Sequence, residues 1–176
     1  MSAVQTQQAS SAAVGQVRAV VEAVPDPEVP VPTIGDLGIV RDVRPADDGA
    51  VEVDLTPTYS GCPAVEAITD AVARAVREHG HDVRVRKVLS PAWTTDWMSD
   101  EGRRKLAQFG ISPPGKRSGG SKVAVSLSRT RPTGRLECPH CGSCDTEELA
   151  RFGSTACKAL WRCTACGEPF DHFKAI

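Results

Sequence analysis

Three short segments in the first half of the chain have the pattern of β-strands. Residues 51, 53 and 55 are apolar and alternate with polar residues, which is typical of a half-buried strand. Val83 and Val85 alternate with arginines in the same way, and residues 39–43 are also rich in β-branched side chains. The pattern therefore predicts strands over 39–43, 51–55 and 83–89.

Three other segments have the helical period. Apolar side chains at 17, 20, 21 and 24 form one stripe, which must end at the proline-rich PDPEVPVP of 25–32. A second stripe, at 65, 68, 72 and 76, lies between Pro63 and Gly80. A third helix is predicted to begin near Ser99, because acidic residues follow at once and basic residues come later, which complements the helix dipole. The prediction is an α+β fold with a three-stranded sheet, in the order helix–strand–strand–helix–strand–helix.

Composition divides the chain into four parts. Residues 1–13 are small and polar and are expected to form a disordered tail, and residues 14–114 form the α/β domain. Residues 115–134 are rich in Gly, Ser, Pro and basic side chains, as in a linker, although the VAVSL within them could form a strand. Residues 135–176 are too few for an ordinary core and hold six of the seven cysteines, so we expect a metal-stabilised module there.

Bulk composition restricts the class of protein. The chain of 176 residues is 40% hydrophobic and 24% charged, with a net charge of -1, and so has no overall attraction to nucleic acid or to an anionic membrane. The first residues lack both a basic start and an apolar run, so we expect no signal peptide and a cytoplasmic location. In a reducing compartment, the cysteines are expected to be ligands or reactive thiols.

The C-terminal cysteines have the spacing of a zinc ribbon. CPHCG at 138–142 and CTACG at 163–167 are two CxxC pairs, each followed by glycine. Such loops can close a tetrahedron of thiolates, so we predict a structural Zn²⁺ held by Cys138, Cys141, Cys163 and Cys166. An iron site with the same ligands, or a disulfide pair, is the alternative. Cys144 could compete for the metal.

The seventh cysteine lies in TPTYSGCP, between a predicted strand and a predicted helix. Proline favours the first helical position, which predicts Cys62 as the N-cap, where the helix dipole would favour its thiolate. Alternatively, Cys62 is a small residue that fills the corner between the strand and the helix without a chemical role. Asp26 and Glu28 are predicted either to approach Cys62, because both segments border the same sheet, or to cap turns.

Three motifs carry a family resemblance. DPEVP at 26–30, IGDLGIVRDV at 34–43 and TPTYSGCP at 56–63 resemble the small iron–sulfur-assembly domain of SufT and of the eukaryotic cytosolic iron–sulfur targeting factors. The resemblance implies that Cys62 handles iron or a transient iron–sulfur cluster, with Asp26 and Glu28 as its acidic motif.

The second half of the chain resembles a narrower family. SPAWTTDWM at 90–98, ISPP at 111–114, FGSTACKALWRC at 152–163 and EPFDHFKAI at 168–176 are similar to the PaaD family of phenylacetyl-CoA epoxidase components. The resemblance implies an accessory role in metal or cluster maturation, with the di-iron oxygenase and the flavin/[2Fe–2S] reductase subunits as partners. Cys157, beside Lys158, is a candidate accessory thiol, or else packs in the ribbon.

The sequence also bears on three other functions: a bridging subunit, nucleic-acid binding and catalysis. A non-catalytic subunit that bridges oxygenase and reductase would also explain the resemblance. The linker is basic, but it lacks aromatic residues for stacking on bases, which disfavours nucleic-acid binding. No base lies near Cys62 in the sequence, and no dinucleotide-binding, P-loop or di-iron motif is present, so the chain is not expected to be a catalyst itself.

Overall fold

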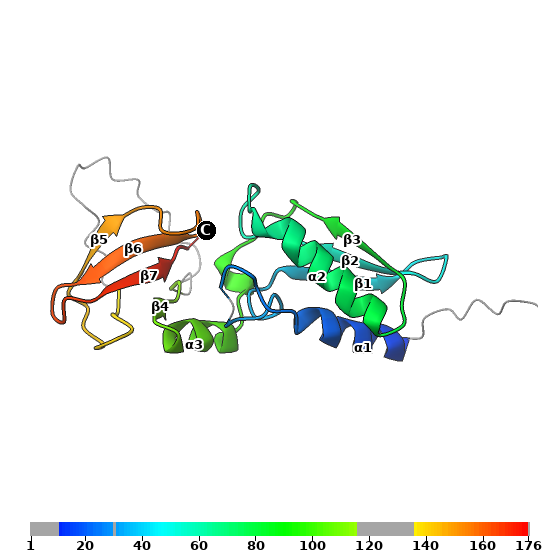
Figure 1. The fold of residues 1–176 in the computed structure, drawn as a ribbon, viewed down its shortest axis with the longest axis horizontal. Helices are drawn as coiled ribbons and strands as arrows, with labels where there is room; N and C mark the ends of the chain where they lie inside the picture. The colour runs from blue at the N-terminus through cyan, green and yellow to red at the C-terminus, as the bar shows by residue number, and fades with distance from the viewer. Residues whose placement is uncertain (1–10, 30, 116–135, 176) are drawn as a thin grey trace, which may run out of the picture. The chain divides into compact units, whose positions relative to one another are not determined.

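The computed structural model describes residues 11–29, 31–115 and 136–175, which form two compact units that divide between Trp93 and Thr94 (Figure 1). The first unit contains a helix, a β-hairpin, a second helix and a third strand. Its elements are α1 (Ser11–Glu22), β1 (Val40–Pro45), β2 (Val51–Leu55), α2 (Ala64–Glu78) and β3 (Val83–Lys87).

The sheet of the first unit has the strand order β1-β2-β3. β1 and β2 are antiparallel, and their turn contains Gly49 at a φ of 87°, a conformation that glycine adopts without strain. β2 and β3 are parallel, as a strand–helix–strand connection through α2 requires. The α+β class, this order of elements and the three-stranded sheet confirm the prediction.

One face of this sheet forms the core. Val51, Val53 and Leu55 of β2 are all 1% exposed or less, and the predicted stripe of α2 is buried with them at Ile68, Val72 and Val76. α1 contacts both β1 and α2, and α2 lies across the strands in Figure 1. The side chains of β2 that alternate with the apolar ones must therefore point to the opposite face.

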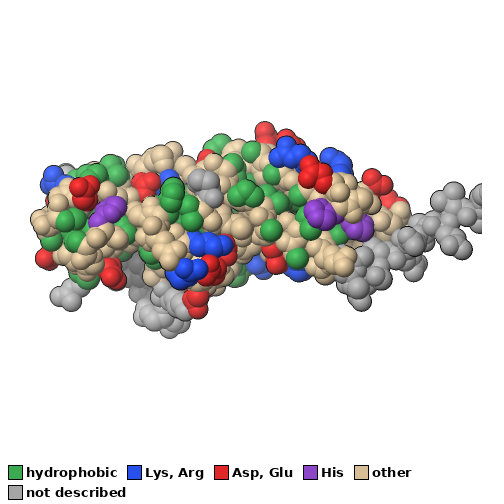
Figure 2. Space-filling model, turned by 60° about the horizontal axis from the view of Figure 1, so that its bottom comes forward, with side chains coloured by type: hydrophobic (Ala, Val, Ile, Leu, Met, Phe, Trp, Pro, Cys, Tyr) green, Lys and Arg blue, Asp and Glu red, His purple; other side chains and the backbone are tan. Residues whose placement is uncertain are grey.

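That opposite face carries a network of charges. Arg44 donates hydrogen bonds to Asp54 at 2.7 Å and to Glu52 at 2.6 Å, and Arg86 of β3 donates to Asp54 at 2.9 Å. Burial raises the pKa of the Asp54 carboxyl, but the two arginines outweigh burial and hold that pKa below its ordinary value. Basic and acidic side chains are also interspersed on the molecular face seen in Figure 2.

The second unit contains a four-stranded sheet in the order β4-β7-β6-β5. β4 is parallel to β7, and the other pairs are antiparallel. A buried cluster of Cys138, Ala159, Trp161, Cys163 and Phe170 forms its core. Its elements are η1 (Thr95–Trp97), α3 (Asp100–Gln108), β4 (Ile111–Ser112), β5 (Thr146–Ala150), β6 (Lys158–Cys163) and β7 (Pro169–Phe173).

Two features differ from what the sequence patterns indicate. α1 begins at Ser11, inside the tail predicted for 1–13. α3 begins after Ser99 as predicted, with the Ser99 hydroxyl accepting from Gly102 N at 2.9 Å, but α3 and β4 belong to the second unit. A compact unit is not by itself an independently folding domain, so the domain boundaries given above stay a prediction.

Some predictions fall outside the described residues. The tail up to residue 10 and the predicted linker from residue 116 onward, with its VAVSL strand, are among them. Among the helices that are described, none has both the length and the apolar character that crossing a membrane requires.

Candidate functional site

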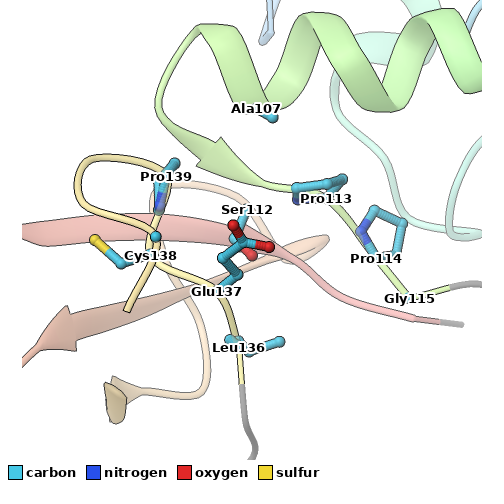
Figure 3. Close-up of a pocket in the computed structure, with 10 residues that line it drawn as sticks. Ala107, Ser112, Pro113, Pro114, Gly115, Leu136, Glu137, Cys138 and Pro139 are labelled. Carbon is cyan, nitrogen blue, oxygen red and sulfur yellow. The ribbon is translucent and has the colours of Figure 1, made fainter. Parts of the chain in front are cut away.

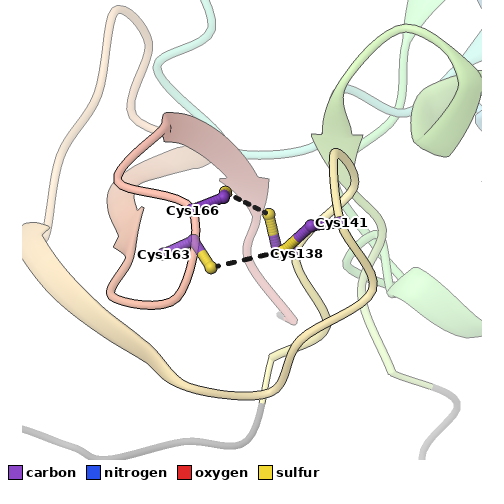
Figure 4. Close-up of side chains that lie close together, drawn as sticks. All are labelled: Cys138, Cys141, Cys163 and Cys166. Atoms are coloured by element: carbon purple, nitrogen blue, oxygen red, sulfur yellow. Dashed lines mark hydrogen bonds between the residues drawn. The ribbon is translucent and has the colours of Figure 1, made fainter.

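The second unit brings together the four cysteines predicted as metal ligands. The Sγ atoms of Cys138, Cys141, Cys163 and Cys166 all lie within 4.8 Å of one another (Figure 4). The sulfurs of Cys138 and Cys166 are 3.9 Å apart, and those of Cys141 and Cys163 are 3.6 Å apart. Four sulfurs at about 2.3 Å from a central Zn²⁺ would be about 3.8 Å from one another, so the cluster fits a tetrahedral thiolate site.

The two CxxC loops have the same backbone geometry. In each loop, the carbonyl of the first cysteine accepts from the glycine N–H four residues later, at 2.9 Å for both Gly142 and Gly167. These glycines have φ values of 74° and 84°, where other residues are strained. The N–H groups of Cys138 and Cys163 in turn donate to Ser143 and Glu168 carbonyls, both at 2.9 Å. The glycines thus allow each loop to turn around its sulfurs.

Backbone donors favour negative charge on the sulfurs. A hydrogen bond from the N–H of Cys166 is the strongest effect on the pKa of Cys163 and lowers it, whereas burial raises it. The Ala165 N–H and the Cys141 thiol lower the pKa further, so that it falls to about 7. Ser143 N–H lowers the pKa of Cys141, but hydrogen bonds with the neighbouring cysteines outweigh this and raise it to about 12. A cation bound among the four sulfurs would require their thiolate forms, so metal binding would release protons.

The cluster is closed as a coordination shell but partly open to solvent. Cys138 and Cys163 are buried, whereas Cys141 and Cys166 are exposed. Four protein ligands leave no open position for a substrate, which is the arrangement of structural metal sites. Cys144 is also exposed, and the four-cysteine group does not include it.

A cavity of about 460 Å³ lies next to the first of these loops (Figure 3). Its walls come from α3 and β4 on one side and from the segment leading into the first CxxC loop on the other. Most lining groups are apolar, and the one charged group among the described lining residues is the carboxylate of Glu137. The lining residues are Ala107, Ser112, Pro113, Pro114, Gly115, Leu136, Glu137, Cys138, Pro139 and Gly142.

The first unit places Cys62 between β2 and α2, as predicted. Cys62 is half-buried and follows two exposed residues, Ser60 and Gly61, so its surroundings are open to solvent on that side. Its N–H donates to the Tyr59 carbonyl at 3.2 Å, which closes a turn just before the helix. All seven cysteines lie in the described part of the chain, and none of them is in a disulfide.

The start of α2 differs by one residue from the prediction. The N-cap position is Pro63, whose φ of -69° and ψ of -24° are already helical, and no side chain caps the helix. Cys62 accepts from Val65 N through its carbonyl at 3.3 Å, so it contributes to the first turn through its backbone. The side chain of Glu66 also lies in the first turn, where its negative charge offsets part of the helix dipole.

Asp26 has a structural role in its loop. Its carboxylate is buried and accepts from the N–H groups of Glu28 and Val29, both at 2.8 Å. This is the turn-capping arrangement, one of the two alternatives predicted from the sequence. Glu28 is half-buried in the same loop. A role of either residue in handling iron stays a prediction.

Cys157 lies in a buried part of the ribbon. It is 4% exposed, and its sulfur is 3.0 Å from the Thr155 hydroxyl. Lys158 beside it is also buried and pairs with Asp171 at 3.0 Å. The Lys158 ammonium is thus engaged by a carboxylate, and neither Cys157 nor Lys158 is exposed. The role of Cys157 as an accessory thiol stays a prediction.

The structure contains a buried polar group near the Cys62 loop that the sequence patterns did not predict. Thr56, the first residue after β2, is 1% exposed, and its hydroxyl has no hydrogen-bond partner among the described residues. Strand alternation places Thr56 on the charged face with Asp54, where a polar residue is expected to be solvated. Only the tertiary structure reveals its burial.

Two family models match the chain. Residues 15–89 match the model described as iron-sulfur cluster assembly protein, and residues 122–174 match the PaaD zinc beta ribbon domain. An Escherichia coli K12 protein, named as a component of a 1,2-phenylacetyl-CoA epoxidase, is 45% identical over 164 residues, which is 93% of each chain.

Other similarities cover about half of the chain. The Fe-S protein maturation auxiliary factor YitW of Bacillus subtilis is 39% identical over 80 residues, which is 44% of this chain and 78% of that protein. A crystal structure of a domain of unknown function from Bacillus anthracis is 28% identical, with a TM-score of 0.49, and the match covers 53% of this chain and 90% of that one.

Proposed function

Because this chain belongs to the PaaD family of phenylacetyl-CoA epoxidase components, we propose that it is an accessory protein of that multicomponent epoxidase in aerobic phenylacetate degradation. Its task is the maturation of iron–sulfur clusters or metal centres in the other subunits, the di-iron oxygenase and the flavin/[2Fe–2S] reductase. The matches to an iron–sulfur assembly model and to a maturation auxiliary factor support this general role.

The observation that carries the proposal is the position of Cys62. This thiol is half-buried at the β2–α2 junction, next to exposed residues, and it lies inside the segment that matches the assembly model. A thiol sealed in the core could not exchange a ligand with another protein, and Cys62 is only half-buried.

A single thiolate suits transfer rather than storage. The Cys62 thiolate contributes one bond to an iron atom of the cargo, and the remaining ligands must come from another molecule. During handover a thiolate of the recipient protein replaces Cys62 on that iron, and Cys62 leaves as a thiolate, so no electron is gained or lost. The proposal needs no second cysteine in the first unit, and the described chain has none there.

The ribbon cysteines have a different role in this account. We propose that Cys138, Cys141, Cys163 and Cys166 hold a structural Zn²⁺, because their sulfurs fit the size of a tetrahedral zinc site. The metal would cross-link two loops that provide two of the buried residues of the core. Its contribution is stability of the ribbon, not chemistry on the cargo.

Asp26 is proposed to act through its loop. By capping the turn with two backbone hydrogen bonds, its carboxylate holds residues 26–29 in place, and Pro25 is bridged to Thr33 next to this turn. Glu28 is proposed as the acidic side chain of this motif that contacts the cargo. Cys157 is assigned to packing, because it is buried and hydrogen-bonded to Thr155.

The proposal can be tested in cells that depend on phenylacetate as carbon source. Replacement of Cys62 by alanine should reduce growth and lower the iron content of the reductase and oxygenase subunits, while Cys157→Ala should not. Normal iron content in the partner subunits of the Cys62→Ala strain would contradict the proposal.

A bridging subunit without a role in maturation is the second candidate, and the cavity of the ribbon unit favours it, because a preformed cavity is typical of binding surfaces. In that case Cys62→Ala would have no effect on iron content. The protein would instead remain bound to the oxygenase and reductase at fixed stoichiometry after washing at high salt.

A further inference from the structure

The cavity beside the first CxxC loop has walls that are fixed before any ligand arrives. Ser112 accepts from the Nδ1 of His172 at 3.1 Å through its carbonyl, and β4, which contains Ser112, pairs with β7. Arg103 of α3 donates to the carbonyl of Pro114. On the opposite wall, the hydroxyl of Thr146 donates to the Leu136 carbonyl at 3.0 Å. Binding here would therefore cost little ordering of the protein.

The chemistry of the lining is asymmetric. Three proline rings, Leu136 and Ala107 supply apolar surface, and proline cannot rearrange its backbone easily. The carboxylate of Glu137 is the charged group, and in Figure 3 its side chain points toward Ser112 and Pro113. Among the described residues, no lysine, arginine or histidine forms an ion pair with Glu137. Although Arg103 donates to the carbonyl of Pro114 in the same wall, the Glu137 carboxylate is an acceptor that no basic side chain of the described residues pairs with.

We propose that this cavity receives an arginine side chain of a partner protein. The methylene stem of an arginine packs well on apolar rings, while its guanidinium donates two parallel hydrogen bonds to one carboxylate. A lysine could supply the charge but not the bidentate geometry. A carboxylate or phosphate ligand would be repelled by Glu137, so anionic metabolites are poor candidates.

The position of the cavity connects docking with the metal. Cys138 is both a lining residue and a member of the four-cysteine cluster, and Pro139 and Gly142 belong to the same loop. A metal that fixes this loop also fixes one wall of the cavity. The proposal concerns partner recognition and does not rest on Cys62, so either can fail without the other.

The experiment uses the full-length, zinc-loaded chain labelled with ¹⁵N. Nα-acetyl-arginine methylamide is titrated in, and the amide signals of Gly115, Glu137 and Gly142 are expected to shift together. The citrulline analogue has nearly the same shape but a neutral urea in place of the guanidinium. It should bind about tenfold more weakly, because a charge-assisted pair is lost.

Matched variants locate the effect. Glu137→Gln should weaken binding of the arginine probe about tenfold, whereas Glu148→Gln, an acidic residue of the same unit outside the cavity, should leave it unchanged. Glu137 is exposed, so its substitution should not unfold the protein. Equal binding to Glu137→Gln, equal binding of citrulline, or shifts elsewhere on the surface would each overturn the proposal.

One further outcome identifies a different occupant. If the wild-type chain ignores the probe, and Glu137→Gln alone moves signals of residues 116–135, the chain's own basic segment fills the cavity, and the partner proposal is wrong. With purified oxygenase and reductase subunits, the same substitution is expected to weaken association about tenfold if the proposal holds. Unchanged affinity for both would contradict it.

Discussion

Replacing Lys158 by methionine should destabilise the ribbon unit far more than replacing Arg162 on the same strand. The Lys158 side chain is 7% exposed and its ammonium lies 3.0 Å from Asp171, which is itself 27% exposed. Arg162 is 51% exposed and pairs with Glu147. The absence of a side chain at Gly153 leaves room for the buried pair. A Cβ at this position would lie 3.1 Å from the Asp171 carboxylate and 3.5 Å from Lys158.

The magnitude follows from the difference in burial. Removing one partner of a buried ion pair costs about 3–5 kcal/mol, because the other charge is left uncompensated. Asp171 keeps some contact with water, so we expect the lower end, about 3 kcal/mol. The exposed pair of Arg162 should contribute about 1 kcal/mol or less. Methionine preserves most of the apolar stem of either side chain. The difference in stability between the two variants therefore reports the loss of the charge.

Native-state hydrogen exchange of the β6 amides measures this stability in the ribbon alone. Lys158→Met should lower their protection by about 150-fold, which corresponds to about 3 kcal/mol, and Arg162→Met by about fivefold or less. The double variant Lys158→Met/Asp171→Leu should recover most of the loss, since no charge is left buried. Equal effects of Lys158→Met and Arg162→Met, or no recovery in the double variant, would refute the reasoning.

Three other predictions concern the metal cluster, the charged sheet face and the glycine turns. Cys166→Ser should lower zinc affinity in a competition with a chelator, whereas Cys144→Ser, also exposed, should keep one zinc per chain; the reverse order would reassign the ligands. The folded pKa of Asp54 is depressed, so its contribution is complete above the unfolded pKa of about 3.9 and is lost as the pH falls through the folded value. Asp54→Asn should therefore destabilise the protein at pH 7, and its free energy of urea unfolding should depend less on pH below about 4. Parallel curves of unfolding free energy against pH for the variant and the wild type would count against this. Gly142→Ala should lower ribbon stability by about 1 kcal/mol because its φ is positive, while Gly15→Ala in α1, with open space around it, should stabilise by about 0.5–1 kcal/mol, both measured by chemical denaturation; equal effects would contradict it.

Local patterns were sufficient where local rules decide the structure. The alternation around Val53 predicted β2, and the stripe through Val72 predicted α2, because one face of each element is buried. The acidic residues after Ser99 predicted the start of α3. The CxxC-Gly spacing predicted the two cysteine loops and their four ligands for the same reason, since each loop is determined within about five residues.

Long-range contacts were not visible in these patterns. The pairing of Ile111 with Asp171 joins segments far apart in the chain, so no local pattern could show that β4 extends the sheet of the ribbon. Burial of Lys158 depends on Asp171 of the adjacent strand, which its position beside a cysteine does not indicate. The one-residue shift at Cys62 arose because Pro63 adopts helical dihedrals while still preceding the helix.

The most direct test of the central claim is the iron and sulfide content of the purified protein after anaerobic reconstitution. With zinc already in the ribbon, the wild-type chain should gain iron together with thiolate-to-iron absorption, and Cys62→Ala should gain neither. Cys144→Ala, which removes an exposed thiol of the ribbon, should behave like the wild type. Undiminished iron binding by Cys62→Ala would show that the cargo is held elsewhere.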